Sequence, residues 1–182
     1  MSDIKTLRMY AKSKQLPQAV KLGSVPQEWI EYAQSVASTT PNTSKQALDQ
    51  RIEQHVIGTE IVNYDQLTEF YNQRYITDIK LPDEINLLQG VHHLRFGVLD
   101  QGKIIPFHLD EPYTLRFVCM ITGSHKFKFE TGLEYLMQQG ELWFINGSYK
   151  HSVENTFNGT RIALLGKFEH CEYNTRIINE LL

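Results

Sequence analysis

The pattern of apolar and polar residues changes character near residue 90. Before that point, apolar residues recur at helical spacing, and from Val91 onward they fall into short runs separated by turn residues. Helical spacing buries one face of a helix, whereas short apolar runs between turns are typical of β-strands. The chain therefore predicts a helical region followed by a β-rich region.

Three helices are expected before residue 90. The first begins at Pro26, because proline is favoured in a first helical turn, and it has apolar residues at helical spacing, namely Trp29, Ile30, Ala33 and Val36. The second runs from Ser44, a suitable N-cap, to about Val56, just before Gly58. The third lies around Gln66 to Tyr75 and places three residues on one side: Leu67, Phe70 and Tyr71. We interpret all three as packing helices.

About seven or eight antiparallel strands are expected from Val91 onward. Leu94–Leu99 and Lys103–His108 flank a short connection that ends at Gly102, where a left-handed conformation is needed. The later strands are Thr114–Thr122, Lys126–Glu130, Glu141–Ile145, Ser148–Asn155 and Thr160–Phe168. Helices followed by short strands predict a jelly roll braced by helices. A chain of 182 residues fits one domain, with residues 1–90 as helical support and residues 91–170 as the β core.

Composition excludes several functional classes. The formal charge of −3 and the isoelectric point near 6.2 provide no basic face for a nucleic-acid backbone. No run approaches the roughly 18 apolar residues that a membrane span needs, and the N-terminus has no secretion signal. Cys119 and Cys171 lack the C-x-x-C spacing of zinc or redox sites and are expected to be small buried residues. We expect a soluble cytoplasmic protein that binds neither nucleic acid nor a membrane.

The spacing of His108, Asp110 and His151 indicates a metal site. His108 and Asp110 lie two positions apart at a strand end, so both side chains emerge on the same face. On a later strand, the same parity turns His151, Val153 and Asn155 inward. Two imidazole nitrogens and one carboxylate are the set that suits Fe(II) when positions must stay open for a co-substrate and O2.

Arg161 is a candidate cation for holding an anionic co-substrate. Its direction depends on the turn that precedes it. A two-residue Asn158-Gly159 hairpin would pair Thr156 with Arg161 and turn the arginine away from the face of His151. A three-residue loop, 157–159, would pair Asn155 with Arg161 and turn the arginine inward, and we predict this loop.

The segment from about His92 to Phe168 resembles the double-stranded β-helix of the Fe(II)/2-oxoglutarate oxygenases. Within them it is similar to the aspartyl/asparaginyl β-hydroxylase family, which also includes free-proline hydroxylases. The matching text is Ile-Pro-Phe-His-Leu-Asp110, then Gly-Glu-Leu-Trp-Phe-Ile-Asn-Gly-Ser-Tyr-Lys-His-Ser-Val-Glu-Asn155, then Arg161. The carboxylate at Asp110 makes the chain resemble the proline-hydroxylase side more, because some members lack this ligand.

The resemblance implies that iron is held by His108, Asp110 and His151, and that Arg161 binds the far carboxylate of 2-oxoglutarate. Family members often carry Arg-x-His after the first metal motif, and here that place reads Arg116-Phe-Val118. The arginine is present and the histidine is not, so Arg116 is kept as a candidate co-substrate contact. The implied reaction hydroxylates an aliphatic carbon of an amino acid or peptide side chain with O2 and releases succinate and CO2.

His93 and Arg95 are candidate substrate contacts, because they share parity on the strand beside the first metal motif. A capping or surface histidine is the commoner role for His92 and His93. Free amino acids, peptide side chains and small metabolites all fit as substrates, and the sequence carries no signal for an oligomeric state. His55, His125 and His170 have no partner pattern and are expected at the surface, whereas the apolar run 143–145 is expected to pack between the sheets.

A second resemblance, to cupins, predicts the same barrel with different chemistry. Gly102 followed by His108, and Gly140 followed by His151 and Asn155, are similar to the two cupin motifs. Cupins usually bind metal through three histidines and a glutamate, and here Asp110 stands where the second histidine is expected. The ligand set favours the oxygenase, with a non-oxidative metal-binding cupin, an isomerase or a binding protein, as the alternative. A barrel that serves only as an interaction module is disfavoured because all four site residues are present.

Overall fold

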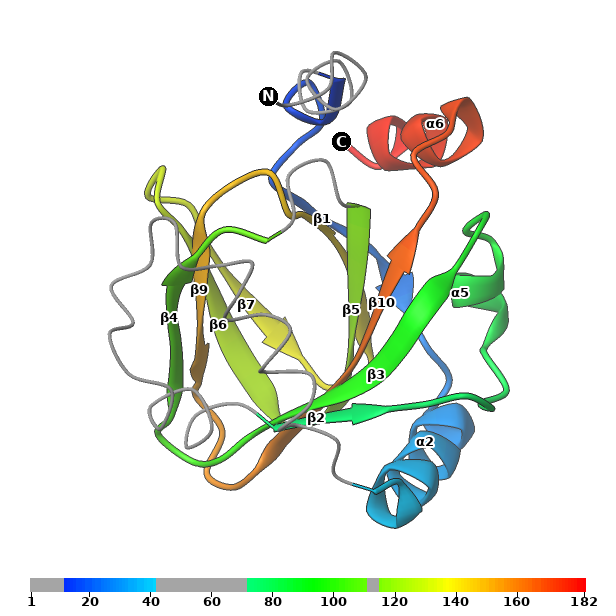
Figure 1. Ribbon diagram of the computed structural model, residues 1–182, viewed down its shortest axis with the longest axis vertical. Helices are drawn as coiled ribbons and strands as arrows, with labels where there is room; N and C mark the ends of the chain where they lie inside the picture. Colours follow the sequence, from blue (N-terminus) through cyan, green and yellow to red (C-terminus); the bar gives the residue numbers. More distant parts are fainter. Residues whose placement is uncertain (1–11, 42–71, 111–114) are drawn as a thin grey trace, which may run out of the picture.

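A computed structural model of the protein describes residues 12–41, 72–110 and 115–182. Its strands form two antiparallel sheets that face each other (Figure 1). The six-stranded sheet has the order β1 (Ala19–Ser24), β8 (Glu141–Asn146), β5 (Leu115–Thr122), β10 (Arg161–Phe168), β3 (His92–Leu99) and β2 (Asn72–Tyr75). The four-stranded sheet has the order β4 (Ile104–His108), β9 (His151–Asn155), β6 (Ser124–Phe129) and β7 (Glu134–Gln138). The predicted double-stranded β-helix is confirmed.

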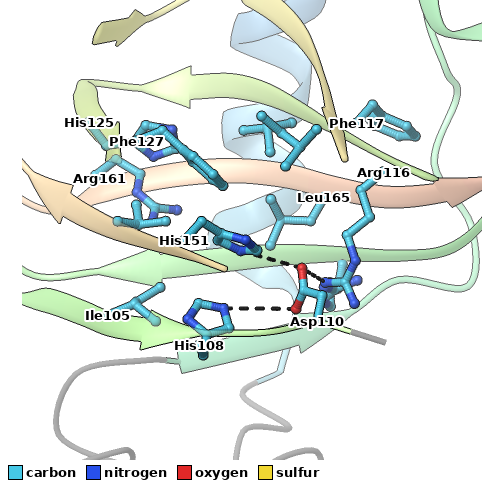
Figure 2. A pocket seen from close by; sticks show the side chains of 14 residues that line it. Ile105, His108, Asp110, Arg116, Phe117, His125, Phe127, His151, Arg161 and Leu165 are labelled. Carbon is cyan, nitrogen blue, oxygen red and sulfur yellow. Dashed lines mark ion pairs between the residues drawn. The ribbon is translucent and has the colours of Figure 1, made fainter. Parts of the chain in front are cut away.

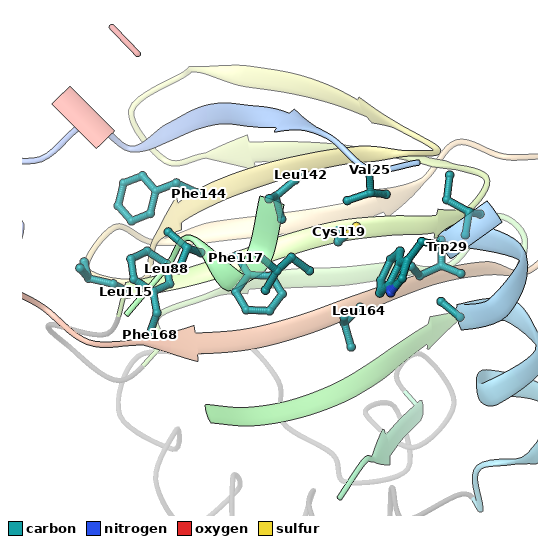
Figure 3. Packing of buried hydrophobic residues seen from close by; sticks show 14 of the residues in the cluster. Val25, Trp29, Leu88, Leu115, Phe117, Cys119, Leu142, Phe144, Leu164 and Phe168 are labelled. Atoms are coloured by element: carbon teal, nitrogen blue, oxygen red, sulfur yellow. The ribbon is translucent and has the colours of Figure 1, made fainter. Parts of the chain in front are cut away.

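The central strand β5 of the six-stranded sheet is buried on both faces, which explains its nearly continuous apolar sequence. Along β5, Val118 and Met120 face the other sheet and pack with residues of β6 such as Phe127. The alternate positions of β5, Phe117 and Cys119 among them, pack on the outer side (Figure 3). In the four-stranded sheet, buried and partly exposed residues instead alternate along β6, which is typical of an antiparallel strand with one face against the core.

Three helices cover the outer side of the six-stranded sheet (Figure 1). They are α2 (Gln27–Thr39), α5 (Asp83–Asn86) and α6 (Glu172–Glu180). The predicted helix after Pro26 is confirmed as α2: Trp29, Ile30 and Ala33 are buried, and Val36 is partly buried. The indole Nε1 of Trp29 donates a hydrogen bond of 2.7 Å to the carbonyl oxygen of Lys80, which ties α2 to the following segment.

The sequence analysis predicted residues 1–90 as a helical support region, but this region also contributes strands. β1 pairs with β8 and β2 pairs with β3, so this region supplies both edge strands of the six-stranded sheet. The helix predicted around Gln66 to Tyr75 is wrong over Asn72–Tyr75, which form β2, and its earlier part lies outside the described residues. Pairing with β3 satisfies the backbone there and overrides the local helical pattern. The helix predicted from Ser44 to Val56 also lies outside the described residues.

The strands predicted after Val91 are confirmed within a few residues, but β1, β7 and the helices α5 and α6 were not predicted. Gly102 adopts the expected positive φ, of 70°. The strands that it separates, β3 and β4, nevertheless lie in different sheets, so the connection crosses between layers. Of the apolar run 143–145, Phe144 packs on the helix side, Ile145 packs between the sheets and Trp143 is partly buried. No helix within the described ranges has the length and apolarity needed to cross a bilayer.

Candidate active site

The two sheets enclose a cavity, and the predicted metal-ligand side chains meet there (Figure 2). β4 pairs with β9, and the register sets His108 directly opposite His151. The centroids of their rings are 4.5 Å apart. Asp110 follows β4 by two residues and lines the same cavity. The pairing of these two strands therefore brings the distant sequence positions 108 and 151 together.

A β-bulge in β4 aims His108 into the cavity. Ile105 and His108 both line the cavity although they lie three positions apart, which a regular strand does not allow. The register of β4 against β9 shifts between these two residues, so the extra residue resets the alternation. Pro106 lies inside this stretch, and the sheet tolerates it because β4 is an edge strand.

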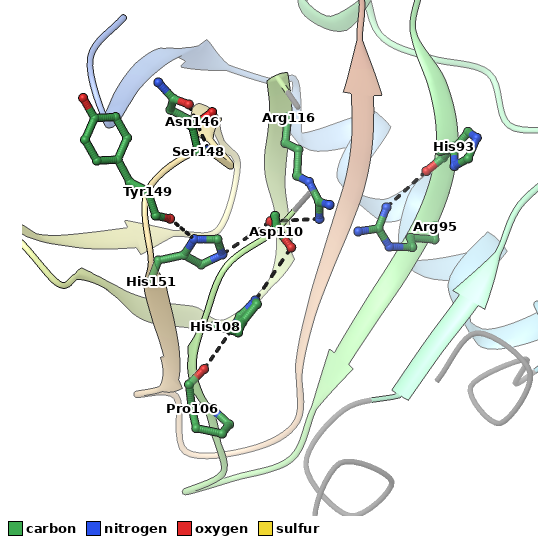
Figure 4. Close-up of polar contacts among 10 residues, drawn as sticks. All are labelled: His93, Arg95, Pro106, His108, Asp110, Arg116, Asn146, Ser148, Tyr149 and His151. Carbon is green, nitrogen blue, oxygen red and sulfur yellow. Dashed lines mark hydrogen bonds and ion pairs between the residues drawn. The ribbon is translucent and has the colours of Figure 1, made fainter. Parts of the chain in front are cut away.

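Backbone carbonyls orient both imidazoles. Nδ1 of His108 lies 2.8 Å from the carbonyl oxygen of Pro106, and Nδ1 of His151 lies 2.8 Å from that of Tyr149 (Figure 4). A carbonyl oxygen only accepts, so each Nδ1 carries the hydrogen and each Nε2 keeps its lone pair. The ring of His151 also stacks on Phe127, with centroids 4.7 Å apart. Both histidines thus present a fixed acceptor nitrogen, the form that binds a metal.

Asp110 completes the cluster. One carboxylate oxygen lies 3.8 Å from Nε2 of His108, and the other lies 3.5 Å from Nε2 of His151. The three potential ligand atoms all lie within 4.8 Å of one another, and the three residues are buried. Nη1 of Arg116 forms an ion pair of 3.0 Å with the carboxylate. Two oriented nitrogens and an anchored carboxylate fit a divalent transition metal with open positions.

Arg161 lies in the same cavity, with 2% of its surface exposed. Its Nη1 donates a hydrogen bond of 3.1 Å to the carbonyl oxygen of Gly97 on the adjacent strand β3. The inward direction was predicted, but the hairpin offered as its reason is wrong. β9 and β10 lie in different sheets and do not pair, so Arg161 points inward because the inner faces of the two sheets oppose each other.

Asn155 builds the turn that the sequence analysis misread as a hairpin. Its amide nitrogen donates hydrogen bonds of 2.8 Å to the carbonyl oxygens of Leu99 and Gly159. Its side-chain oxygen accepts a hydrogen bond of 2.8 Å from the backbone N–H of Phe157. Asn155 therefore holds the crossover from one sheet to the other, directly before the strand that carries Arg161.

The structure separates the two predicted substrate contacts. Arg95 is buried and lines the cavity, whereas His93 is exposed and lies outside the cavity (Figure 4). The prediction from shared parity fails because the pairing of β3 with β10 is irregular near His93, which has a φ of 54°. The main-chain oxygen of His93 instead accepts a hydrogen bond of 3.3 Å from Nη1 of Arg95.

His125 was predicted at the surface, and that prediction is wrong. It is 1% exposed, lines the cavity, and its Nε2 lies 3.1 Å from Sδ of Met137. Burial, together with the charge of Arg161, holds the pKa of His125 well below its ordinary value. The alternation of His125 with two buried aromatic residues, Phe127 and Phe129, was the signal that could have revealed its inward position.

Other predicted residues lie away from the cavity or outside the described ranges. His170 is half-buried rather than a surface residue, and burial and the charge of Lys12 lower its pKa. His55 lies outside the described residues. Cys119 is buried as predicted, and burial together with Glu84 raises the pKa of its thiol to about 12, whereas Cys171 is only partly buried.

The fold and the cavity define a class: a double-stranded β-helix with two histidines and a carboxylate in the cavity between its sheets. A family model described as aspartyl/asparaginyl beta-hydroxylase matches residues 76–171. This match spans just over half of the chain, which therefore belongs to that family of hydroxylases. No curated protein sequence matches the chain.

Two solved structures illustrate the similarity. A prolyl-4-hydroxylase from Pseudomonas putida has a TM-score of 0.53 at 14% identity and covers 91% of this chain and 99% of its own. The cupin domain of Schizosaccharomyces pombe Cnp3 has a TM-score of 0.44 at 8% identity and covers 58% of this chain and 69% of its own. At such identities the Pseudomonas structure establishes a shared fold, over nearly the whole chain.

Proposed function

We propose that the protein is an Fe(II)/2-oxoglutarate-dependent dioxygenase. It hydroxylates an aliphatic carbon of an amino acid or peptide side chain and converts 2-oxoglutarate to succinate and CO2. The single observation that carries this proposal is the convergence of His108, Asp110 and His151 with Arg161 in one buried cavity. Membership of a hydroxylase family supports the same reaction class.

Three residues would hold the metal. Nε2 of His108, Nε2 of His151 and the carboxylate of Asp110 would bind an iron ion, and three protein ligands would leave coordination positions for the co-substrate and O2. When bound, the iron supplies the oxidising chemistry that no side chain in the cavity can perform. The carbonyls of Pro106 and Tyr149 keep both imidazoles in the required tautomer throughout.

The two arginines nearest the ligands have different tasks in this proposal. Arg161 binds the far carboxylate of 2-oxoglutarate in a two-pronged hydrogen bond, and the carbonyl of Gly97 holds its guanidinium in place. Arg116, predicted as a co-substrate contact, pairs with Asp110 and so acts as a positioning residue for the carboxylate ligand. This pair constrains the orientation of Asp110.

Apolar side chains from both sheets line the remaining wall of the cavity, including Ile105, Val118, Phe127, Val153 and Leu165. These residues exclude water from the space around the ligand cluster, which strengthens the electrostatic contacts of bound anions. The substrate, a small molecule or a peptide, would bind in this space.

The deciding experiment needs no knowledge of the substrate. Protein purified without oxygen is loaded with Fe(II), and succinate release is measured in air with and without 2-oxoglutarate. We expect slow succinate formation that depends on both iron and 2-oxoglutarate. A protein that binds metal tightly yet forms no succinate would instead fit a non-oxidative metal-binding cupin.

A further inference from the structure

The carbonyl oxygens that orient the two metal-ligand histidines are held in different ways. For His108 the partner is Pro106, which lies in the same strand, β4. For His151 the partner is Tyr149, which lies in the turn between β8 and β9, residues 146–150. A strand is fixed by its sheet, whereas a turn needs other contacts to hold its carbonyl groups in one place. The orientation of His151 therefore depends on what holds this turn.

The N-terminal segment, residues 13–17, contacts the turn through Asn146, which is fully buried. The amide nitrogen of Asn146 donates a hydrogen bond of 2.7 Å to the carbonyl oxygen of Ser13. It also lies 3.3 Å from the carbonyl oxygen of Pro17 and 3.4 Å from that of Leu16. One side-chain amide thus joins the turn to main-chain groups of a segment near the other end of the sequence.

Three more contacts fasten the turn. The side-chain oxygen of Asn146 accepts a hydrogen bond of 3.1 Å from the backbone N–H of Ser148. The hydroxyl groups of Ser148 and Ser13, both fully buried, lie 2.7 Å apart. The hydroxyl of Tyr149 donates a hydrogen bond of 3.1 Å to the carbonyl oxygen of Lys14, whose Nζ lies 3.6 Å from the centroid of the tyrosine ring. The residue that orients the metal ligand is therefore held by the N-terminal segment from two sides.

We propose that the N-terminal segment positions the metal centre. It holds the turn, the turn fixes the carbonyl of Tyr149, and that carbonyl fixes the imidazole of His151 (Figure 4). A hydrogen bond to the second nitrogen of a ligating histidine orients its ring and increases its affinity for the metal. Asn146 and Ser13 are thus positioning residues that act through Tyr149. The inference rests on the proposed ligand role of His151 and does not depend on which reaction follows.

Asn146→Asp tests the proposal with almost no change in shape. Aspartate keeps an oxygen for the N–H of Ser148, but an ionised carboxylate cannot donate to the carbonyl of Ser13. The substitution therefore releases the N-terminal segment and preserves the hydrogen bond within the turn. We expect the Kd for Mn(II) to rise about 10-fold, the lower end of what loss of a ligating histidine's direct partner costs. Equilibrium dialysis without oxygen measures this Kd, and the visible absorption of the Co(II)-loaded protein reports the ligand geometry.

Asn174→Asp is the matched control, because Asn174 is a fully buried asparagine with the same kinds of contact on α6. Its amide nitrogen donates hydrogen bonds of 3.0 Å and 2.7 Å to the carbonyl oxygens of Gln89 and Glu169. Its side-chain oxygen accepts one of 3.0 Å from the backbone N–H of Gln89. Both variants should lose stability in urea to a similar extent. Asn174→Asp should nevertheless keep the Co(II) spectrum of the wild type and a Kd for Mn(II) within about 2-fold of it.

Tyr149→Phe provides a milder change that keeps the test valid if Asn146→Asp does not fold. It removes the hydrogen bond to Lys14 and keeps both the ring and the main-chain carbonyl that His151 contacts. We expect the Kd for Mn(II) to rise about 3-fold, which corresponds to the loss of one hydrogen bond.

The outcomes separate this inference from the ligand set. If the wild type binds Mn(II) and every folded variant of the turn binds it equally well, the N-terminal segment has no role at the metal and the site itself remains. Equal losses of affinity in Asn146→Asp and Asn174→Asp would assign the effect to lower stability and overturn the inference in the same way. A wild type that binds neither Mn(II) nor Co(II) overturns the ligand role of His151 and this inference with it.

Discussion

At the scale of the residue, carbonyl contacts decide what the histidines can do. A histidine has two nitrogens, and which one binds a metal depends on the partner of the other. His108 and His151 each place Nδ1 on the carbonyl of the residue two positions earlier, so their Nε2 atoms converge on Asp110. The sequence contains the histidines, but it does not reveal these contacts.

His108→Ala should abolish tight iron binding, because two remaining ligands hold the metal much less well than three. We expect affinity for Fe(II), or for Mn(II) as a stable substitute, to fall by at least about 100-fold. Equilibrium dialysis without oxygen measures it. His92→Ala is the matched control, since His92 is exposed and its Nδ1 also lies close to the carbonyl two positions earlier, Gly90, at 2.7 Å. Unchanged iron occupancy in His108→Ala would rule out the proposed ligand set.

Arg161→Ala should raise the KM for 2-oxoglutarate far more than Arg161→Lys. Alanine removes both the charge and the two-pronged contact, whereas lysine keeps a single charged contact. We expect an increase of about 100-fold for alanine and about 10-fold for lysine. Initial rates of succinate formation at varied 2-oxoglutarate provide the measurement. A KM that neither variant changes would show that the co-substrate binds elsewhere.

At the scale of the element, irregularities rather than regular strands position the site. The bulge in β4 places His108 on the same cavity-facing side of the strand as Ile105. The turn that Asn155 stabilises connects β9 to β10 in the opposite sheet. A regular hairpin between β9 and β10 would have kept both strands in one sheet. The crossover lets Arg161 face His151 across the cavity instead of beside it.

Asn155→Ala should destabilise the protein by about 2 to 3 kcal/mol, because it removes three buried or partly buried hydrogen bonds in the connection between the two sheets. Urea unfolding followed by circular dichroism measures the free energy of unfolding. Asn158→Ala is the control: its side chain makes one exposed hydrogen bond, to Gln101, and its loss should change stability by no more than about 0.5 kcal/mol. Equal effects of the two substitutions would contradict a special role for Asn155.

At the scale of the whole molecule, closing two sheets around a cavity buries groups that alone would be exposed. His125 is the clearest case, since the sequence offered no partner for it and the barrel encloses it beside Arg161. The folded state therefore disfavours the protonated form of this histidine, whereas the unfolded chain does not. The architecture thus makes the stability of the protein sensitive to pH.

The free energy of unfolding should fall as the pH drops below about 6.5, the ordinary value for histidine. In that range the unfolded chain binds a proton at His125 that the folded protein does not, because its folded pKa is lowered. Each pH unit then costs up to about 1.4 kcal/mol. The test measures the free energy of unfolding in urea for the wild type and His125→Gln, at pH values from about 7.5 to about 5.5. The variant should show a smaller slope, and an identical slope in both proteins would count against this linkage.

By itself, the sequence determined the elements and the chemistry that they carry. The spacing of apolar residues was enough for α2 and most strands, because helix and strand periods follow from backbone geometry. The residue types at 108, 110, 151 and 161 indicated a metal and an anion, because ligand chemistry belongs to single side chains. The fold class followed from both together.

Only the tertiary structure decided which strands share a sheet and which side chains face the cavity. β1 and β2 became strands through pairing with distant partners, and His93 and Arg95 were separated by an irregular pairing with β10. Packing between the sheets formed the ion pair of Arg116 with Asp110, and it also buried His125. These outcomes depend on contacts between residues far apart in the chain, which a local pattern of apolar and polar positions does not contain.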